Sequence, residues 1–170
     1  MKTLLKILGA IVVCLILFLA IARITGFGPH DRTPGLWLKG NLVTTPVADW
    51  SFTDRIPTIT IQTESWYLLP HSVHVDCMSY NGQLYLSSVY PQGTSRTWND
   101  NALRDPHVRI KIGNDLYDRT LSLVIDPDEQ QHALEAKSKK YPELKVRPNS
   151  TIHVFRVVGA NQRREEKGSA

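Results

Sequence analysis

Residues 97–113 read TWNDNALRDPHVRIKIG, and this stretch decides the fold. Residues 97–104 are predicted to form a short helix. It ends before Pro106, because the residue that precedes a proline is disfavoured in the helical region. Residues 107–112 then alternate polar and apolar side chains with a period of two, which is typical of a half-buried strand. Gly113-Asn114-Asp115 follows as a hairpin turn, so this part of the domain combines helix and antiparallel strand.

Short strand patterns lie on both sides of this stretch. Asn81-Gly82 is the strongest hairpin signal, because both central residues of that turn take positive φ. Since hairpins join neighbouring strands, the sheet is predicted to be antiparallel, and closure into a barrel would remove its exposed edges. The predicted strands cover residues 58–63, 71–80, 84–90, 107–112, 116–125 and 151–158.

A second helix is predicted from Asp126 to about Tyr141. Asp126 is its N-cap, Pro127 occupies the first helical position, and Glu129 can reach back to the cap. Three lysines are interpreted as its solvated face: Lys137, Lys139 and Lys140. Two helices flanking an antiparallel sheet place the domain in the α+β class.

The N-terminal segment differs from the rest of the chain. Residues 7–22 are uncharged and mostly apolar, between Lys6 and Arg23. This length is close to the lower limit for a membrane-spanning helix and favours an uncleaved, single-pass anchor over residues 1–24. A signal peptide cleaved after Ala20-Ile21-Ala22 and a buried core helix are the alternatives. Slightly more basic charge precedes the run than follows it, which places the body on the non-cytoplasmic, periplasmic side.

The remaining roughly 150 residues suffice for one compact domain. Residues 25–57 are rich in glycine and proline and are predicted to be a tether and irregular lead-in. Residues 58–158 are predicted to form the barrel domain, and residues 159–170 a disordered tail. The formal net charge of +4 lies mainly at the chain ends. The nearly neutral body therefore argues against a nucleic-acid binder.

The two cysteines and the histidines predict neither a disulfide nor a metal site. Cys14 lies in the apolar N-terminal run and Cys77 in the body, so no pair is available within the domain. No Cys/His spacing of a zinc site is present. His71 and His74 would not converge on a metal, because strand positions i and i+3 project to opposite faces.

Residues 81–88 (NGQLYLSS) and residues 98–113 carry a family resemblance. The Trp-x-x-Asn helix, the Asp-Pro stop and the strand studded with basic residues match in kind and spacing. From about Pro34 to Val158 the chain resembles the split β-barrel proteins related to pyridoxamine 5′-phosphate oxidase, and within them the deazaflavin-dependent nitroreductase branch. The resemblance implies an antiparallel split β-barrel, FMN or deazaflavin as cofactor, hydride or electron transfer to a small molecule, and a homodimer.

The candidate site residues combine this resemblance with residue spacing. Trp98 and Asn101 share one helix face, where they can flank an isoalloxazine-like ring or simply pack and hold the helix to the sheet. Arg109 and Lys111 share a strand face and can form a phosphate clamp with a residue before the helix, or a solvated surface. The predicted cofactor-binding residues are Trp98, Asn101, Arg96, Ser88, Lys111, His71 and Ser72. No catalytic residue is predicted.

The region between the first two core strands favours a second hypothesis. Family members usually carry a glycine-rich, basic phosphate-binding stretch there, whereas residues 63–72 read TESWYLLPHS. This stretch offers a phosphate no basic side chain and no glycine turn. The alternative is a non-catalytic envelope binding domain that kept the barrel and lost the cofactor. A haem-binding relative, with His71 or His74 as axial ligand, is a third reading.

Overall fold

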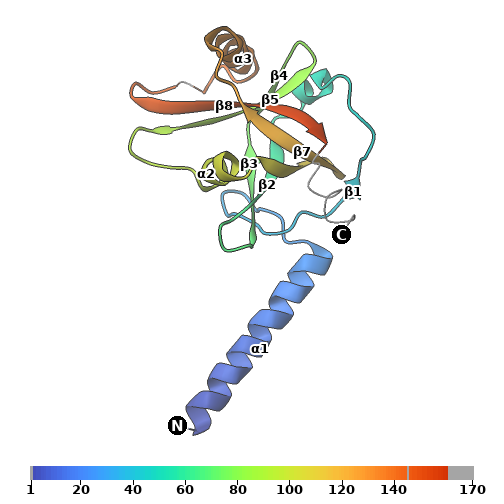
Figure 1. The fold of residues 1–170 in the computed structure, drawn as a ribbon, viewed down its shortest axis with the longest axis vertical. Helices are drawn as coiled ribbons and strands as arrows, with labels where there is room; N and C mark the ends of the chain where they lie inside the picture. Colours follow the sequence, from blue (N-terminus) through green and yellow to red (C-terminus); the bar gives the residue numbers. More distant parts are fainter. Residues whose placement is uncertain (1, 145, 161–170) are drawn as a thin grey trace.

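The computed structural model describes residues 2–144 and 146–160. One long helix, α1 (Lys2–Thr25), leads into a β-barrel domain flanked by α2 (Thr97–Arg104) and α3 (Pro127–Lys140) (Figure 1). A short 3-10 helix, η1 (Ser51–Arg55), precedes the main strands. The strands are β1 (Asn41–Leu42), β2 (Ile59–Glu64), β3 (Pro70–Val75), β4 (Cys77–Tyr80), β5 (Gln83–Pro91), β6 (His107–Ile112), β7 (Asp115–Leu123) and β8 (Ser150–Ala160).

The sheet is antiparallel along its main path, in the order β3-β2-β6-β7-β8-β5-β4. The short β1 pairs in parallel with β7 at the side of this path. Asn81 and Gly82 both have positive φ and form the predicted turn between β4 and β5. The predicted α+β class and antiparallel barrel are therefore confirmed, as are the positions of both flanking helices.

The first and last strands of the sheet are consecutive in the chain. The single strand predicted over residues 71–80 is wrong, because only Asp76 separates β3 from β4. β3 pairs with β2, whereas β4 pairs with β5 at the other end of the sheet. The bend at Asp76 therefore joins the two ends of the sheet and curls it into a barrel.

Two apolar clusters lie on opposite faces of the sheet. The inner cluster fills the barrel and includes the fully buried Ile61, Leu86 and Ile110. The outer cluster lies under α3 and packs Ala133 against Met78 and other residues of β4, β5 and β8. Because successive strand residues face opposite sides, β4 and β5 contribute to both clusters.

Two lysines of α3 face the barrel, so the predicted solvated face is wrong for them. Lys137 is buried, and its Nζ lies 3.1 Å from Asp76 Oδ2 and 2.8 Å from Ser87 Oγ. Lys140 Nζ donates to the carbonyl oxygens of Thr53 at 2.8 Å and Cys77 at 2.7 Å. The bend at Asp76 exposes polar groups that need donors, and the long lysine stems supply them. Only Lys139 is fully exposed, as predicted for all three.

The start of α3 confirms part of the predicted cap. Asp126 caps the helix by accepting from the backbone N–H of Asp128 at 3.2 Å, with proline next in the chain. Glu129 does not reach back to this cap. Its Oε1 accepts from the Tyr85 hydroxyl and from Arg156, each at 2.8 Å. Burial and this hydrogen bond raise the pKa of Tyr85 to about 12.

The N-terminal helix is long and apolar enough to cross a membrane, and a signal sequence at this position fits the same description. The lead-in that follows, residues 26–57, contacts the barrel domain at several points. Gly35 pairs with Ser72 of β3, β1 pairs with β7, and Leu38 and Trp50 are buried against the barrel. At the other end, β8 continues through Ala160, two residues beyond the predicted strand. The rest of the predicted tail, residues 161–170, lies outside the described residues.

Replacing Lys137 with alanine is expected to lower the free energy of unfolding by ~2 kcal/mol, because Asp76 and Ser87 lose their shared partner. The partial exposure of Asp76 keeps this loss below that of a fully buried pair. Chemical denaturation of the purified full chain measures the difference. Lys139→Ala on the exposed face is the matched control and should change stability by less than about 0.5 kcal/mol. Equal stability of the two variants would contradict the role given to Lys137.

Candidate functional site

A cavity of about 490 Å³ lies at the outer edge of β3, between the start of α2 and the loop after α1. It wraps around this edge strand, so residues from both faces of β3 contribute to its wall. We refer to it as the β3–α2 cavity. Its lining residues are Pro29, Asp31, Arg32, Thr33, Pro34, His71, Val73, His74, Ser95, Arg96, Thr97 and Trp98.

The loop after α1 is held against β3 by backbone pairing. Gly35 N–H donates to the Ser72 carbonyl at 2.8 Å, and Ser72 N–H donates to the Gly35 carbonyl at 2.9 Å. This bridge satisfies polar groups at the free edge of the sheet. A Cβ atom at position 35 would clash with backbone atoms of Phe27, Gly28 and Pro29. The close approach therefore requires glycine, and it brings Arg32 to the cavity.

Positive charge exceeds negative charge in the wall of the cavity. The exposed guanidinium groups of Arg32 and Arg96 have no ion pair within the described residues, and Asp31 is the one carboxylate in the lining. Arg96 is also the N-cap residue of α2 and makes no side-chain cap hydrogen bond. The positive end of the α2 dipole adds to the two arginines. The cavity therefore suits an anion.

The apolar part of the wall comes from Trp98 and Val73. Trp98 is 7% exposed and packs against Phe155 of β8, with ring centroids 5.8 Å apart. It belongs to the inner core cluster and also borders the cavity. A planar aromatic ligand would find a rigid surface here, because the indole ring is fixed by the core.

The two histidines of β3 reach the cavity from opposite faces. His74 pairs across the sheet with Thr60, and its Nδ1 lies 3.1 Å from the Thr60 hydroxyl. His71 lies three residues earlier, on the other face, and burial lowers its pKa below the usual 6.5. They project to opposite faces, yet both line the cavity because it wraps around the edge of β3. Among the described residues, no group of three or more metal-ligating side chains is found.

Four of the predicted site residues lie elsewhere. Asn101 is buried and donates from Nδ2 to Thr63 Oγ1 at 3.1 Å, which fastens α2 to β2. Lys111 lies across the sheet, paired with Thr60 and Leu116. Ser88 is buried in β5, where it pairs with His153 of β8, and Ser72 is buried in β3 between the lining residues His71 and Val73. The structure thus brings His71, Arg96 and Trp98 together at one cavity, and leaves Asn101, Lys111, Ser88 and Ser72 out of its wall.

The expected phosphate clamp of Arg96, Arg109 and Lys111 is not assembled. Arg109 pairs with Asp118 of β7, with Nε–Oδ1 and Nη2–Oδ2 distances of 2.6 and 2.9 Å. The hydrogen bond to Asp118 raises the pKa of Arg109. Arg109 thus forms an ion pair between two strands of the sheet and does not line the cavity. Arg32 and Arg96 are the arginines that line it.

The hydroxyl groups of Ser72 and Ser88 are buried and have no hydrogen-bond partner within the described residues; Ser65 is the third such case. Buried hydroxyls usually have a partner, so each marks a place for a water molecule or a ligand atom. Ser88 pairs across the sheet with His153, whose Nδ1 lies 2.9 Å from Asn99 Oδ1.

Sequence reasoning missed Arg32 and Asn99. No local pattern in the sequence indicates that the loop carrying Arg32 pairs with β3. Asn99 is fully buried between Tyr90 and His153, at 3.4 and 2.9 Å. The three-residue helical spacing from Trp98 favours Asn101 and gives no reason to choose Asn99.

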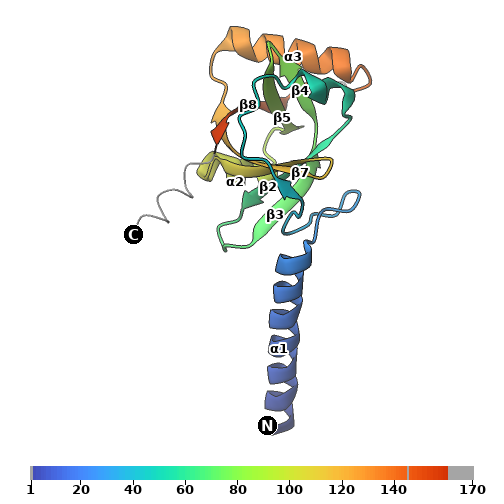
Figure 2. The ribbon, with the colours of Figure 1, turned by 90° about the vertical axis from the view of Figure 1, so that its right-hand side faces the viewer.

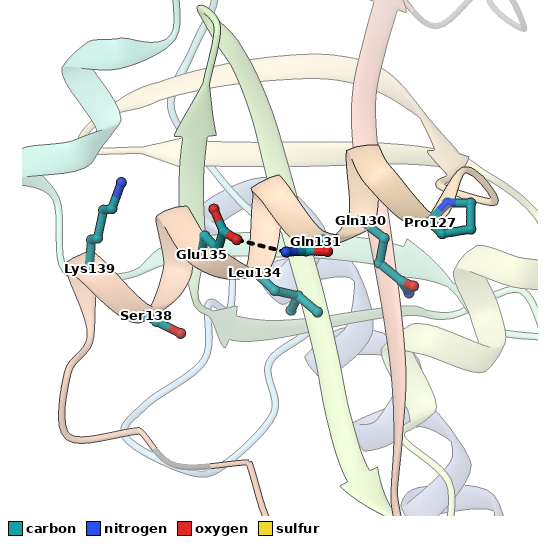
Figure 3. Close-up of a pocket in the computed structure, with 7 residues that line it drawn as sticks. All are labelled: Pro127, Gln130, Gln131, Leu134, Glu135, Ser138 and Lys139. Carbon is teal, nitrogen blue, oxygen red and sulfur yellow. Dashed lines mark hydrogen bonds between the residues drawn. The ribbon is translucent and has the colours of Figure 1, made fainter.

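A second hollow, of about 610 Å³, lies along α3 at the other end of the domain. Figure 3 shows that its lining side chains all project from this one helix, among them Gln130, Leu134 and Lys139. Gln131 Nε2 donates to Glu135 Oε1 at 3.0 Å within it. The lining of this hollow contains one lysine, one glutamate and no aromatic ring. The hollow therefore suits an anionic or aromatic ligand less well than the β3–α2 cavity does.

Comparisons with known proteins support the fold. No protein-family model and no curated protein matches the chain. Among solved structures, a conserved hypothetical protein from Mycobacterium tuberculosis matches at 16% identity and a TM-score of 0.51, covering 65% of this chain and 77% of that chain. A structure described as a domain-swapped dimer matches at 22% and 0.50, covering 61% and 81%.

An F420-H2-dependent reductase matches at 22% identity and a TM-score of 0.49, covering 61% of this chain and 95% of that chain. The first two similarities, with TM-scores of 0.51 and 0.50, concern the fold and not the activity. The split β-barrel inferred from the sequence resemblance is confirmed.

Gly35→Ala is expected to detach the loop that carries Arg32 while leaving the barrel folded, because the added Cβ clashes with backbone atoms of residues 27–29 in the same loop and with no strand of the barrel. Hydrogen exchange of the Ser72 amide should accelerate at least tenfold. Gly28→Ala in the same loop is the control, since its Cβ would make only an ordinary contact with Leu38. Unchanged exchange in Gly35→Ala would contradict the docking of this loop.

The lowered pKa of His71 makes stability depend on pH. As the pH falls, the unfolded chain takes up a proton at His71 at a higher pH than the folded chain does. The free energy of unfolding is therefore highest above pH 6.5 and decreases as the pH drops below it. His71→Gln should reduce the loss of thermal stability between about pH 7 and pH 5. A resonance of His71 that titrates above 6.5 in an NMR experiment would contradict this assignment.

Proposed function

We propose that the chain is a membrane-tethered oxidoreductase that holds FMN or a deazaflavin in the β3–α2 cavity and transfers hydride or electrons to a small molecule. The observation that carries this proposal is the cavity itself, which joins two unpaired arginines to a fixed indole ring. Its volume of about 490 Å³ lies in the range of small-molecule sites.

The residues present fit a phosphate-bearing, planar cofactor. Arg32 and Arg96 are donors for a phosphate, and each can bind two of its oxygens at once. The start of α2 supports the same charge. Trp98 and Val73 supply an apolar surface for the ring system. The basic loop that relatives place between their first two core strands is replaced here by arginines from the α1 loop and from the segment before α2.

When bound, such a cofactor supplies the hydride or electron transfer itself. The chain's own residues bind, orient and shield it. His71, whose pKa is lowered by burial, is neutral at pH 7 and can donate one hydrogen bond or move one proton at the cavity wall. Trp98, packed into the core, excludes water from one side of the cavity.

The proposed assembly is a homodimer anchored by α1, with the barrel domain on the periplasmic side. The structural neighbour described as a domain-swapped dimer is consistent with dimerisation of a chain of this fold. α1 is apolar along its length and nearly all exposed, which suits a lipid-facing helix. The slight excess of basic charge before α1 supports the orientation.

A non-catalytic envelope binding domain is the second candidate. The observation in its favour is the β2–β3 turn, residues 65–69, which offers exposed Trp66, Tyr67 and Leu68 and no basic side chain. A haem-binding protein is a further candidate, because His71 and His74 line the same cavity and either imidazole can serve as an axial ligand.

Titration of the detergent-solubilised full chain with FMN and with a deazaflavin tests the proposal. We expect binding of one of them, and a roughly tenfold or greater loss of affinity in Arg32→Ala and in Arg96→Ala, because each removes a charged donor. Arg104→Ala, at the other end of α2, is the control and should bind as the parent chain does.

The absorbance of the natively purified chain distinguishes the candidates. A band at about 450 nm indicates a flavin, and one at about 420 nm indicates a deazaflavin. A Soret band that is lost in a His71 or His74 variant indicates haem. A colourless chain that binds none of these cofactors supports the non-catalytic domain.

A further inference from the structure

The β2–β3 turn exposes three large side chains in succession. Trp66 is 79% exposed, Tyr67 51% and Leu68 78%. Trp66 and Tyr67 contact each other edge to face, with ring centroids 5.4 Å apart. Scattered exposed apolar residues are normal on a soluble domain, but an aromatic pair beside a leucine at one protruding tip indicates a partner.

The backbone of this turn supports the same conclusion. Leu68 has a φ of 63°, in the left-handed region that glycine or asparagine adopts at lower cost. The turn is closed by hydrogen bonds from Leu68 N to Ser65 O at 3.0 Å and from Ser65 N to Leu69 O at 3.1 Å. Because the Leu68 side chain is exposed, burial within the domain does not offset the cost of this backbone conformation. Its presence at a strained, exposed position therefore points to a contact outside the chain.

Both views of the molecule place this turn at the end of the domain from which α1 emerges (Figures 1 and 2). The tip of the β2–β3 hairpin lies level with the C-terminal end of α1 in each view, whereas α3 lies at the opposite end of the domain. Because the two views differ by a 90° turn, the hairpin tip and the helix end share one level along the long axis.

That level corresponds to the surface of a bilayer if α1 spans it. A helix of 24 residues is about 36 Å long, and the hydrocarbon core is about 30 Å thick. The end of α1 therefore emerges among the lipid headgroups. Tryptophan and tyrosine are enriched at this depth, since their rings combine an apolar body with a polar tip. The exposed Arg23, in the last turn of α1, can pair with anionic headgroups there.

We propose that Trp66, Tyr67 and Leu68 insert into the membrane interface as a second point of attachment beside α1. This inference rests on the membrane tethering proposed above. Two points of attachment prevent the barrel from rotating about the axis of α1. A single helix followed by a loop would allow this rotation. They also hold the β3–α2 cavity at a defined position relative to the lipid surface, since His71 follows Leu68 by only three residues.

Tryptophan fluorescence of the full chain in vesicles tests the proposal. The chain has four tryptophans and none lies in α1, and of the four Trp66 is the most exposed. The chain is reconstituted in vesicles of phosphatidylcholine and phosphatidylglycerol whose acyl chains carry bromine. We expect quenching by the brominated lipid that falls at least twofold in Trp66→Phe.

Leu68→Gly separates a lipid contact from a structural role. Glycine relieves the positive φ, so the thermal midpoint should stay equal or rise, while quenching of Trp66 by brominated lipid should fall about twofold. Ile125→Ser is the matched control, because this exposed apolar residue lies two positions before α3, at the far end of the domain. It should leave quenching unchanged.

Two results would overturn the inference. Quenching of Trp66 by aqueous acrylamide but not by brominated lipid places the turn in water. Shielding from both quenchers indicates that a second protein copy covers it. Extraction with alkaline carbonate separates this from the tethering itself: release of the chain from the vesicles overturns both proposals, whereas a retained chain with a water-exposed Trp66 overturns only this one.

Discussion

At Asp76 the chain leaves one edge of its sheet and joins the other, and the end of α3 holds this bend in place. Lys137 binds the Asp76 carboxylate at 3.1 Å, and Lys140 donates to the Cys77 carbonyl at 2.7 Å. The Tyr141 hydroxyl donates to the Pro57 carbonyl at 2.7 Å and lies 3.2 Å from Cys77 N. These contacts satisfy backbone groups that the bend removes from the sheet, so barrel closure and the docking of α3 depend on each other. Burial around this junction raises the pKa of the Cys77 thiol.

The same bend leaves β3 as an edge strand, and an edge strand needs a cover. The loop after α1 provides it by pairing Gly35 with Ser72. The cavity that forms between this loop, β3 and α2 is therefore a consequence of how the barrel closes. Its positive charge comes from Arg32 on the covering loop and Arg96 beside the helix, which are far apart in sequence. The segment that connects α1 to the domain thus also builds one wall of the proposed cofactor site.

The two ends of the domain differ in what they offer to a partner. One end carries α1 and the β2–β3 turn, and the other carries α3 (Figure 2). The β3–α2 cavity borders the loop after α1, whereas the outer face of α3 is mostly polar. An apolar helix and exposed aromatic residues at one end suit a lipid surface, whereas glutamines and lysine along α3 suit water. In the proposed arrangement, the redox site lies close to the membrane and the two arginines on the side of the barrel hold the cofactor.

The sequence by itself determined the local elements. The alternation in β6, the proline after α2, the Asn81-Gly82 turn and the Asp126 cap each depend on neighbouring residues, so their patterns predicted the structure well. Only the tertiary structure decided where β3 ends, because the break at Asp76 serves pairing with two distant strands. It also decided that Lys137 and Lys140 face inward and that Arg32 rather than Lys111 joins Arg96. Such contacts connect residues tens of positions apart, and they arise only when the barrel closes and its polar groups find partners.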